Sequence, residues 1–343
     1  MNRTEVTKDG LTHVRPGREA LTGAIEHAGP RRRRGAEQAM VPDAAFTSYY
    51  GKPVINKPVW EAPDIPGYLF LGGLAGGSAL LAAGAELTGR RRLARRSKVA
   101  ANAAAVLSTA ALVHDLGRPE RFLNMLRVMK PTSPMSMGSW VLAPFGGIST
   151  VAAVLDLLGR LPLVGKLATF TAAALGLPLA SYTAALLADT AVPSWHEGYR
   201  EMPFVFVASA AASAGGLGIA VAPLHESAPA RRMAVAGGLA ELALSKVMEK
   251  RMGLPGEAYS EGRAHRYMQA AEGLTAAGAV GAVVGRRSRV LSALSGLAVL
   301  AGSVCTRWGI FHAGLQSAED PKYTVVPQRE RLRLRGQRQP VRV

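Results

Sequence analysis

Four basic residues in one predicted loop have the chemistry to bind carboxylate or phosphate groups. The loop joins two apolar runs, and Pro131 and Pro134 mark the start of the second run. Arginine side chains hold such groups in a forked geometry with two hydrogen bonds. We therefore expect this loop to meet a partner or ligand, through Arg118, Arg121, Arg127 and Lys130.

Polar residues within apolar runs form a second group of candidates, because ionisable groups inside a membrane are costly and usually functional. They are Glu86, Asn102, Asp115, Tyr182, Glu241 and Glu272. The Tyr182 phenol lies in an otherwise aliphatic run, where it needs a hydrogen-bond partner or a ligand oxygen. A structural network and a ligand contact both remain open for it.

Two of the carboxylates have a structural interpretation beside the chemical one. Asp115 follows His114 and either pairs with Arg118 or handles protons. Glu86 lies one turn before Arg90 and either reaches the membrane interface or transfers protons.

Asp64 and Tyr68 stand at the head of the first apolar run, beside Trp60 and Pro66. An interfacial aromatic belt would explain these residue types. A ligand site at the head of this run is the alternative.

The apolar runs that carry these residues predict an all-α integral membrane protein. The chain has 343 residues, of which 48% are hydrophobic. A helix of roughly 20 apolar residues crosses a membrane, and runs of this kind lie at 67–88, 99–117, 138–159, 166–188, 202–222, 267–285 and 289–312. A weaker run at 230–250 carries Glu241, Lys246, Glu249 and Lys250 in its second half. Counting it, we expect a bundle of eight transmembrane helices over residues 61–316.

Polar, basic segments flank this domain. Residues 1–60 hold no apolar stretch of the kind found in a cleavable signal peptide, and we expect a disordered tail. Residues 317–343 form a second basic tail, which we also expect to be disordered. The net charge of +17 indicates contact with lipid head groups and no nucleic-acid partner, because aromatic residues do not alternate with the basic ones.

Short basic linkers predict the orientation. The link Arg90–Lys98 is strongly basic, and the other linkers expected on its side carry almost no acidic residues. Basic short loops favour the cytoplasm. This places the loop with Arg118 and Lys130 on the outer side of the plasma membrane.

Several kinds of redox centre are excluded or disfavoured by residue types. The single cysteine, Cys305, cannot hold an iron-sulfur cluster. A haem between helices needs two facing histidines, and His114 and His312 fall on one predicted side but at helix ends.

The four glycines of the first run form pairs spaced for close helix packing: Gly72, Gly73, Gly76 and Gly77.

Three segments together resemble the NrfD/PsrC-type polysulfide reductase membrane-anchor family, over roughly residues 58–316. They are Gly67–Gly77, Asp115–Phe122 and Pro131–Trp140. The resemblance implies an eight-helix subunit with no redox centre of its own, which binds menaquinone or ubiquinone near the outer face. It also implies an iron-sulfur, ferredoxin-like partner that serves a molybdopterin catalytic subunit. The chain would then be a non-catalytic electron-transfer subunit in anaerobic respiration.

Carried over residue by residue, the resemblance implies a quinone pocket at Tyr68, Ser133 and Tyr182. The protons of the quinone need a titrating group nearby, and Asp64, His114 and Asp115 are the candidates. An interpretation from another class is a secondary transporter or ion-translocating bundle, with a path lined by Glu86, Glu241 and Glu272. Internal repeats would favour the transporter, and the two halves of the sequence show no convincing similarity.

Overall fold

Long antiparallel helices make up most of the part of the chain that the structure describes. The computed structural model describes residues 53–116 and 119–338. The long helices are α2 (Asp64–Leu87), α3 (Arg91–Asp115), α4 (Pro134–Leu158), α5 (Pro162–Ala188), α7 (Met202–Val221), α8 (Ala228–Met252), α9 (Gly262–Val284), α10 (Arg289–Glu319) and α11 (Lys322–Arg338). Short helical segments between them are η1 (Pro119–Leu126), α6 (Pro193–His196), η2 (Glu197–Arg200), η3 (Leu254–Tyr259) and η4 (Gly285–Arg287).

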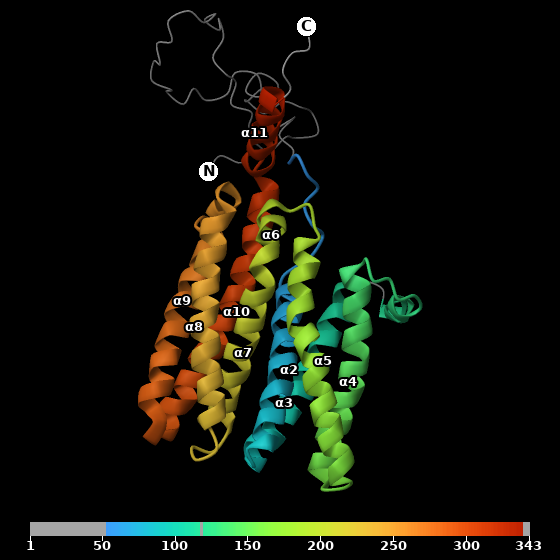
Figure 1. Ribbon diagram of the computed structural model, residues 1–343, viewed down its shortest axis with the longest axis vertical. Coiled ribbons are helices and arrows are strands. Elements are labelled where there is room, and N and C mark those ends of the chain that lie inside the picture. Colours follow the sequence, from blue (N-terminus) through green and yellow to red (C-terminus); the bar gives the residue numbers. More distant parts are fainter. Residues whose placement is uncertain (1–52, 117–118, 339–343) are drawn as a thin grey trace, which may run out of the picture. The chain divides into compact units, whose positions relative to one another are not determined.

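The chain divides into two compact units, which we describe separately. Val59–Gly314 forms the helical bundle that holds α2 to α9 and most of α10 (Figure 1). The second unit contains α11 and the described residues that precede Val59.

Five of the helices are long and apolar enough to cross a membrane: α2, α4, α5, α7 and α10. The described chain is therefore that of a multi-pass membrane protein. The helices α3, α8 and α9 are as long but carry more charge, for example the arginines of the first two turns of α3. Five spans of the expected eight are supported in this way, and an eight-span bundle stays a prediction.

Consecutive helices of the bundle run in opposite directions, so their connections gather at two ends (Figure 1). At one end lie the connections at 88–90, 159–161, 222–227 and 285–288, and we call this the basic end. At the other, which we call the site end, lie the start of α2 and the connections at 116–133, 189–201 and 253–261. The expectation that the basic linkers share one side is confirmed.

The basic link between the first two runs is shorter than we expected. The turn covers only residues 88–90, and Arg91 begins α3, so most of the expected link Arg90–Lys98 is helix. Arginine is a good helix former, and a long basic side chain at a helix end can reach polar surroundings while its stem packs. The amide of Leu93 in the first turn is satisfied by Glu226 Oε2 at 2.9 Å, across the bundle.

The first helix packs closely against two neighbours through its glycines. Gly76 and Gly176 of α5 face each other, and a Cβ on Gly176 would lie 2.8 Å from the Gly76 carbonyl oxygen. A Cβ on Gly77 would lie 2.9 Å from Cβ of Ala214 in α7. The prediction that the glycines of this helix serve close packing is confirmed for Gly76 and Gly77, and it places α2 in the interior of the bundle.

A helix follows α10 where we expected a disordered tail. In the second unit, α11 begins just after Pro321, and its Lys322 amide donates to Asp320 Oδ1 at 2.9 Å. The Arg, Leu, Gln and Glu residues of its second half are strong helix formers. The expectation of disorder from residue 317 is therefore wrong for 322–338. Residues 53–60 of the other predicted tail are described and form no helix, and residues 1–52 and 339–343 lie outside the described residues.

Candidate functional site

The first turn of α2 and the last turn of α3 bring an acid and an imidazole together at the site end. Nδ1 of His114 lies 2.8 Å from Oδ2 of Asp64. The His114 side chain is 80% exposed and that of Asp64 only 24%. Two residues that are 50 positions apart in the chain thus form one pair, with the imidazole on its solvent-facing side.

Tyr68 lies one turn further into α2 and is buried. Its carbonyl oxygen accepts a hydrogen bond from the Ser108 hydroxyl of α3 at 3.3 Å. The aromatic ring is therefore covered by the bundle and does not lie in an interfacial belt.

The tyrosine of α5 meets the proline-containing segment at the start of α4. Gly138 faces the Tyr182 ring so closely that a Cβ on it would lie 2.7 Å from Cδ2 and 2.8 Å from Cζ. Ser133 caps the same helix, since its hydroxyl accepts a hydrogen bond from the Ser136 amide at 3.4 Å, and Pro134 occupies the first turn. Tyr182 and Ser133 thus lie at the same end of α4.

The Tyr182 hydroxyl group is buried and has no hydrogen-bond partner among the described residues. A buried hydroxyl left unsatisfied costs about 1–3 kcal/mol. Such a group fits a ligand that brings its own acceptor, and a quinone carbonyl is an acceptor of this kind.

Asp115 stays close to the proposed site, and Glu86 does not. Asp115 ends α3 at the site end and accepts a hydrogen bond from the Glu61 backbone. Glu86 lies near the other end of α2, where its carboxylate pairs with Lys98, which also binds Asp156 of α4 at 2.9 Å. The buried lysine thus ties α2, α3 and α4 together, and Glu86 has a structural partner at the basic end.

The predicted docking loop is only partly described. Arg118 lies outside the described residues, as does the side chain of Arg121. Arg127 and Lys130 are exposed on the connection between α3 and α4, which protrudes from the bundle beside α4 (Figure 1). Exposed apolar side chains accompany them: Leu123, Val128 and Met129.

The chain matches the family model described as "Polysulphide reductase, NrfD" over residues 53–252, which is more than half of its length. It belongs to the NrfD family. The match begins just before α2 and ends with the last residue of α8, so it includes every residue of the candidate site. It is shorter than the resemblance that we saw in the sequence, since α9 and α10 lie beyond it. No curated protein matches the chain.

The histidines of this NrfD protein make separate contacts. His114 pairs with Asp64, whereas the His312 ring stacks on Tyr267 with ring centroids 5.3 Å apart. Within 53–116 and 119–338, no group of three or more His, Cys, Asp or Glu side chains is placed to hold a metal ion.

A buried arginine in the NrfD bundle is a feature that we did not identify in the sequence. Arg307 of α10 is buried, lies over the Phe206 ring at 3.6 Å and donates to the Phe206 carbonyl oxygen at 2.9 Å. It interacts electrostatically with Glu241 of α8, which also accepts a hydrogen bond from Ser303 at 3.3 Å. The sequence feature that could have identified Arg307 is its position inside the apolar run 289–312.

The three carboxylates of the transporter hypothesis lie in different surroundings. Glu86 is in the lysine-bridged cluster at the basic end, and Glu241 is in the core beside Arg307. Glu272 is partly exposed and pairs with Lys246 of α8. Glu86 and Glu272 each form an ion pair with a lysine, whereas Glu241 has only an electrostatic interaction with Arg307, and the structure does not bring the three into one contact.

An aromatic cluster at the site end was also missed. The Trp195 indole of α6 is fully buried, with its ring centroid 5.6 Å from that of Trp60 and 6.0 Å from that of Phe311. Its Nε1 donates to the Ile310 carbonyl oxygen at 2.8 Å. This cluster fixes the residues before α2 against α10, and its members come from segments too far apart for spacing to reveal.

Proposed function

We propose that this NrfD protein is a quinone-binding membrane subunit that passes electrons between the quinone pool and an iron-sulfur partner. The observation that carries the proposal is the buried Tyr182 hydroxyl, which has no hydrogen-bond partner among the described residues. The ring of this tyrosine packs on Gly138, in the segment Pro131–Trp140 that resembles the family. The Asp64–His114 pair lies at the same end of the bundle. A hydrogen-bond donor and an acid-base pair are the two groups that quinone reduction or quinol oxidation requires.

The residues have separate tasks. Tyr182 donates a hydrogen bond to a quinone carbonyl, and Tyr68 and Ser133 complete the head-group contacts. Asp64 and His114 hold a proton between the covered site and solvent, since the imidazole is the exposed member of the pair. Asp115 is the further proton acceptor in this region. Menaquinone or ubiquinone, when bound, supplies a two-electron step that takes up or releases two protons.

The electron partner is an iron-sulfur, ferredoxin-like subunit, with a molybdopterin catalytic subunit behind it. Arg127 and Lys130 are exposed on the α3–α4 connection, together with apolar side chains. Exposed positive charge steers an acidic partner and sets its orientation. We place Arg118 and Arg121 on the same docking surface from their positions in the sequence. The complex would belong to anaerobic respiration in the plasma membrane.

Quinone binding to the purified full chain tests this proposal. Quenching of tryptophan fluorescence reports binding of a short-chain menaquinone or ubiquinone, because Trp60 and Trp195 lie at the site end. Tyr182→Phe and Tyr68→Phe should each weaken binding by about 1–2 kcal/mol, the usual value of one lost hydrogen bond. Tyr199→Phe, at an exposed tyrosine of η2, is the control. Wild-type affinity in both pocket variants would reject the pocket, and no binding of either quinone would reject the function.

A further inference from the structure

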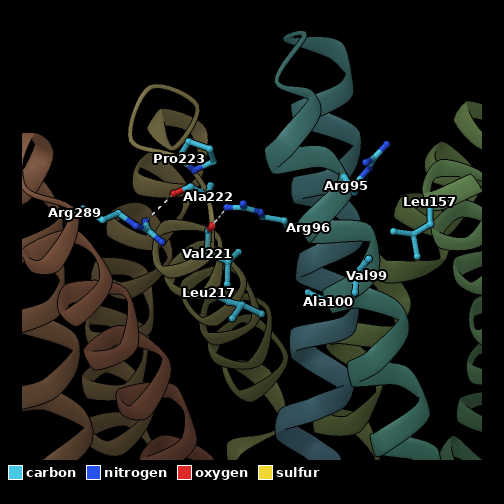
Figure 2. Close-up of a pocket in the computed structure, with 10 residues that line it drawn as sticks. All are labelled: Arg95, Arg96, Val99, Ala100, Leu157, Leu217, Val221, Ala222, Pro223 and Arg289. Carbon is cyan, nitrogen blue, oxygen red and sulfur yellow. Dashed lines mark hydrogen bonds between the residues drawn. The ribbon is translucent and has the colours of Figure 1, made fainter. Parts of the chain in front are cut away.

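A groove at the basic end combines an aliphatic lining with fixed positive charges. Its volume is about 770 Å³, and it lies between α3 and α7, with α4 and α10 at its sides (Figure 2). Seven of the ten lining residues are uncharged: Val99, Ala100, Leu157, Leu217, Val221, Ala222 and Pro223. The other three are Arg95, Arg96 and Arg289. The groove lies at the opposite end of the helices from Tyr68 and Tyr182.

Two arginines approach the end of α7 from opposite sides of the groove (Figure 2). Arg96 of α3 donates to the Val221 carbonyl oxygen. Arg289 of α10 donates to the carbonyl oxygens of Ala222 at 2.7 Å and Ile219 at 3.0 Å. The last carbonyl groups of a helix have no partner within the helix, so these bonds hold both guanidinium groups in place.

These bonds do not neutralise the two charges. Carbonyl oxygens carry only partial charge, and neither Arg96 nor Arg289 forms an ion pair with a carboxylate in the described part of the chain. Arg95 differs, because Asp156 pairs with it at 2.8 Å. A guanidinium has five N–H donors, and Arg96 uses one of its terminal nitrogens for the Val221 bond. Donors and net charge thus remain for an anion.

The surroundings strengthen the positive potential. A neighbouring cavity of about 600 Å³ shares Arg95 with the groove, and its basic residues, among them Arg91, Arg92 and Arg160, outnumber its two carboxylates, Glu86 and Asp156. On the other side, Arg231 lies within electrostatic range of both Arg289 and Arg286. Like charges gathered in this way favour an anion and disfavour a zwitterion.

We infer that this groove binds an anionic phospholipid, with the phosphodiester on Arg96 and Arg289 and an acyl chain along the aliphatic lining. The aliphatic lining favours a lipid over a soluble anion. An acyl chain can bury apolar surface against Val99, Leu157 and Leu217, whereas inorganic phosphate has no apolar surface to bury. Below the groove, the exposed face of α3 continues with Val106 and Leu107, which offers the chain an apolar track. Basic pockets between helices at a membrane surface are suited to anionic head groups.

Native mass spectrometry of the purified full chain in detergent tests the inference. The probes are phosphatidylglycerol, phosphatidylcholine with the same acyl chains, and inorganic phosphate. The wild-type chain should retain phosphatidylglycerol in preference to phosphatidylcholine. The Arg96→Gln/Arg289→Gln variant should bind phosphatidylglycerol at least about tenfold more weakly, because charge-assisted hydrogen bonds are lost. Arg232→Gln/Arg287→Gln removes the same charge from exposed positions outside the groove, and should retain the lipid.

A second variant separates lipid binding from the support that the arginines give to α7. Val99→Trp fills the groove from a 40% exposed position and leaves both arginines intact, so it should also reduce retention. Val280→Trp, at an exposed position of α9, should not. The inference is overturned if phosphatidylcholine is retained equally, if inorganic phosphate displaces the lipid, or if both groove variants bind like their controls.

Discussion

Nδ1 of His114 lies 2.8 Å from Oδ2 of Asp64, and this contact joins the last turn of α3 to the first turn of α2. The imidazole faces solvent, whereas the carboxylate is largely covered by the bundle. Asp64 is one turn from the buried Tyr68, so the pair connects the interior of the site end with its surface. A proton held between the two side chains can leave or arrive through the imidazole without a wider opening of the bundle.

Removing the charge of Asp64 should therefore slow proton-coupled turnover more than it weakens quinone binding. In Asp64→Asn the imidazole loses its anionic partner, and positioned proton transfer typically contributes about 10²-fold or more to a rate. Quinone-linked turnover in membranes, compared with quinone affinity of the purified chain, measures the two effects separately. Asp189→Asn, an exposed carboxylate at the same end, serves as the control. Normal turnover in Asp64→Asn would remove the pair from the mechanism.

Gly138 should be as important for the quinone site as the tyrosine that packs on it. A methyl group in Gly138→Ala would collide with the Tyr182 ring and push the phenol from its position. We expect quinone affinity to fall by about 1–2 kcal/mol, as for loss of the hydroxyl itself. Gly146→Ala lies on the same helix with nothing within 4 Å of the new Cβ, and it should bind quinone like the wild type. Equal affinity in the two variants would contradict the assignment.

The apolar runs were sufficient to predict the helices and the two ends at which their linkers gather. The length of an apolar run predicts a membrane-crossing helix. Because consecutive helices alternate in direction, the linkers then fall alternately at the two ends of the bundle. The start of α3 could not be predicted from hydropathy, because the polar residues from Arg91 to Lys98 interrupt the apolar run. Arginine is nevertheless a good helix former, and the helix begins at Arg91. The α11 helix was missed because its basic composition resembles that of a solvated tail.

The candidate site was predictable in its residue types and less so in its contacts. Tyr182 stood out because a polar group in an apolar run needs a partner, whereas Asp64 and Tyr68 were candidates from their place at the head of the first run and from the family resemblance. Which partner each one has depends on packing between distant segments, as the Asp64–His114 and Tyr182–Gly138 contacts show. Glu86 was a candidate for proton transfer, but the structure gives it an ion pair with Lys98. This pair could not be predicted, because it depends on the close packing of α2 and α3.

Loss of Arg307 should be among the more destabilising single changes in the bundle. Arg307→Met removes the cation that interacts electrostatically with the buried Glu241 and leaves the Phe206 carbonyl oxygen without its donor. We expect a cost of up to about 3–5 kcal/mol, the value for breaking a full buried ion pair. Arg266→Met, at an exposed position of α9, should cost little. The double variant Glu241→Met/Arg307→Met should recover most of the lost stability. Unfolding in detergent, followed by helix content, measures all four proteins; additive losses in the double variant would show that the two side chains are not coupled.

Charge reversal on the α3–α4 connection should release the iron-sulfur partner. Arg127→Glu/Lys130→Glu turns an attractive surface into a repulsive one. We expect the same of Arg121→Glu from its place in the sequence. Co-purification of the partner from membranes at low and raised salt measures the effect, since salt weakens contacts between exposed charges. Arg160→Glu changes an exposed charge at the basic end and should leave the complex intact. Full co-purification of the loop variants at raised salt would exclude this docking surface.

The basic end should face the cytoplasm, which determines on which side the protons are exchanged. Ser97 is only 3% exposed within α3 and cannot report on the side, although it lies in the basic segment Arg90–Lys98. Thr88 is exposed in the α2–α3 turn, so a cysteine at this position can report on which side of the membrane the basic end lies. In a Cys305→Ser background, an impermeant thiol reagent added to intact cells should modify Asn124→Cys of η1 at the site end and leave Thr88→Cys unmodified until the cells are broken. The opposite pattern would invert the protein, moving the proposed partner and the proton exchange through His114 to the cytoplasmic side while leaving the quinone site itself unchanged.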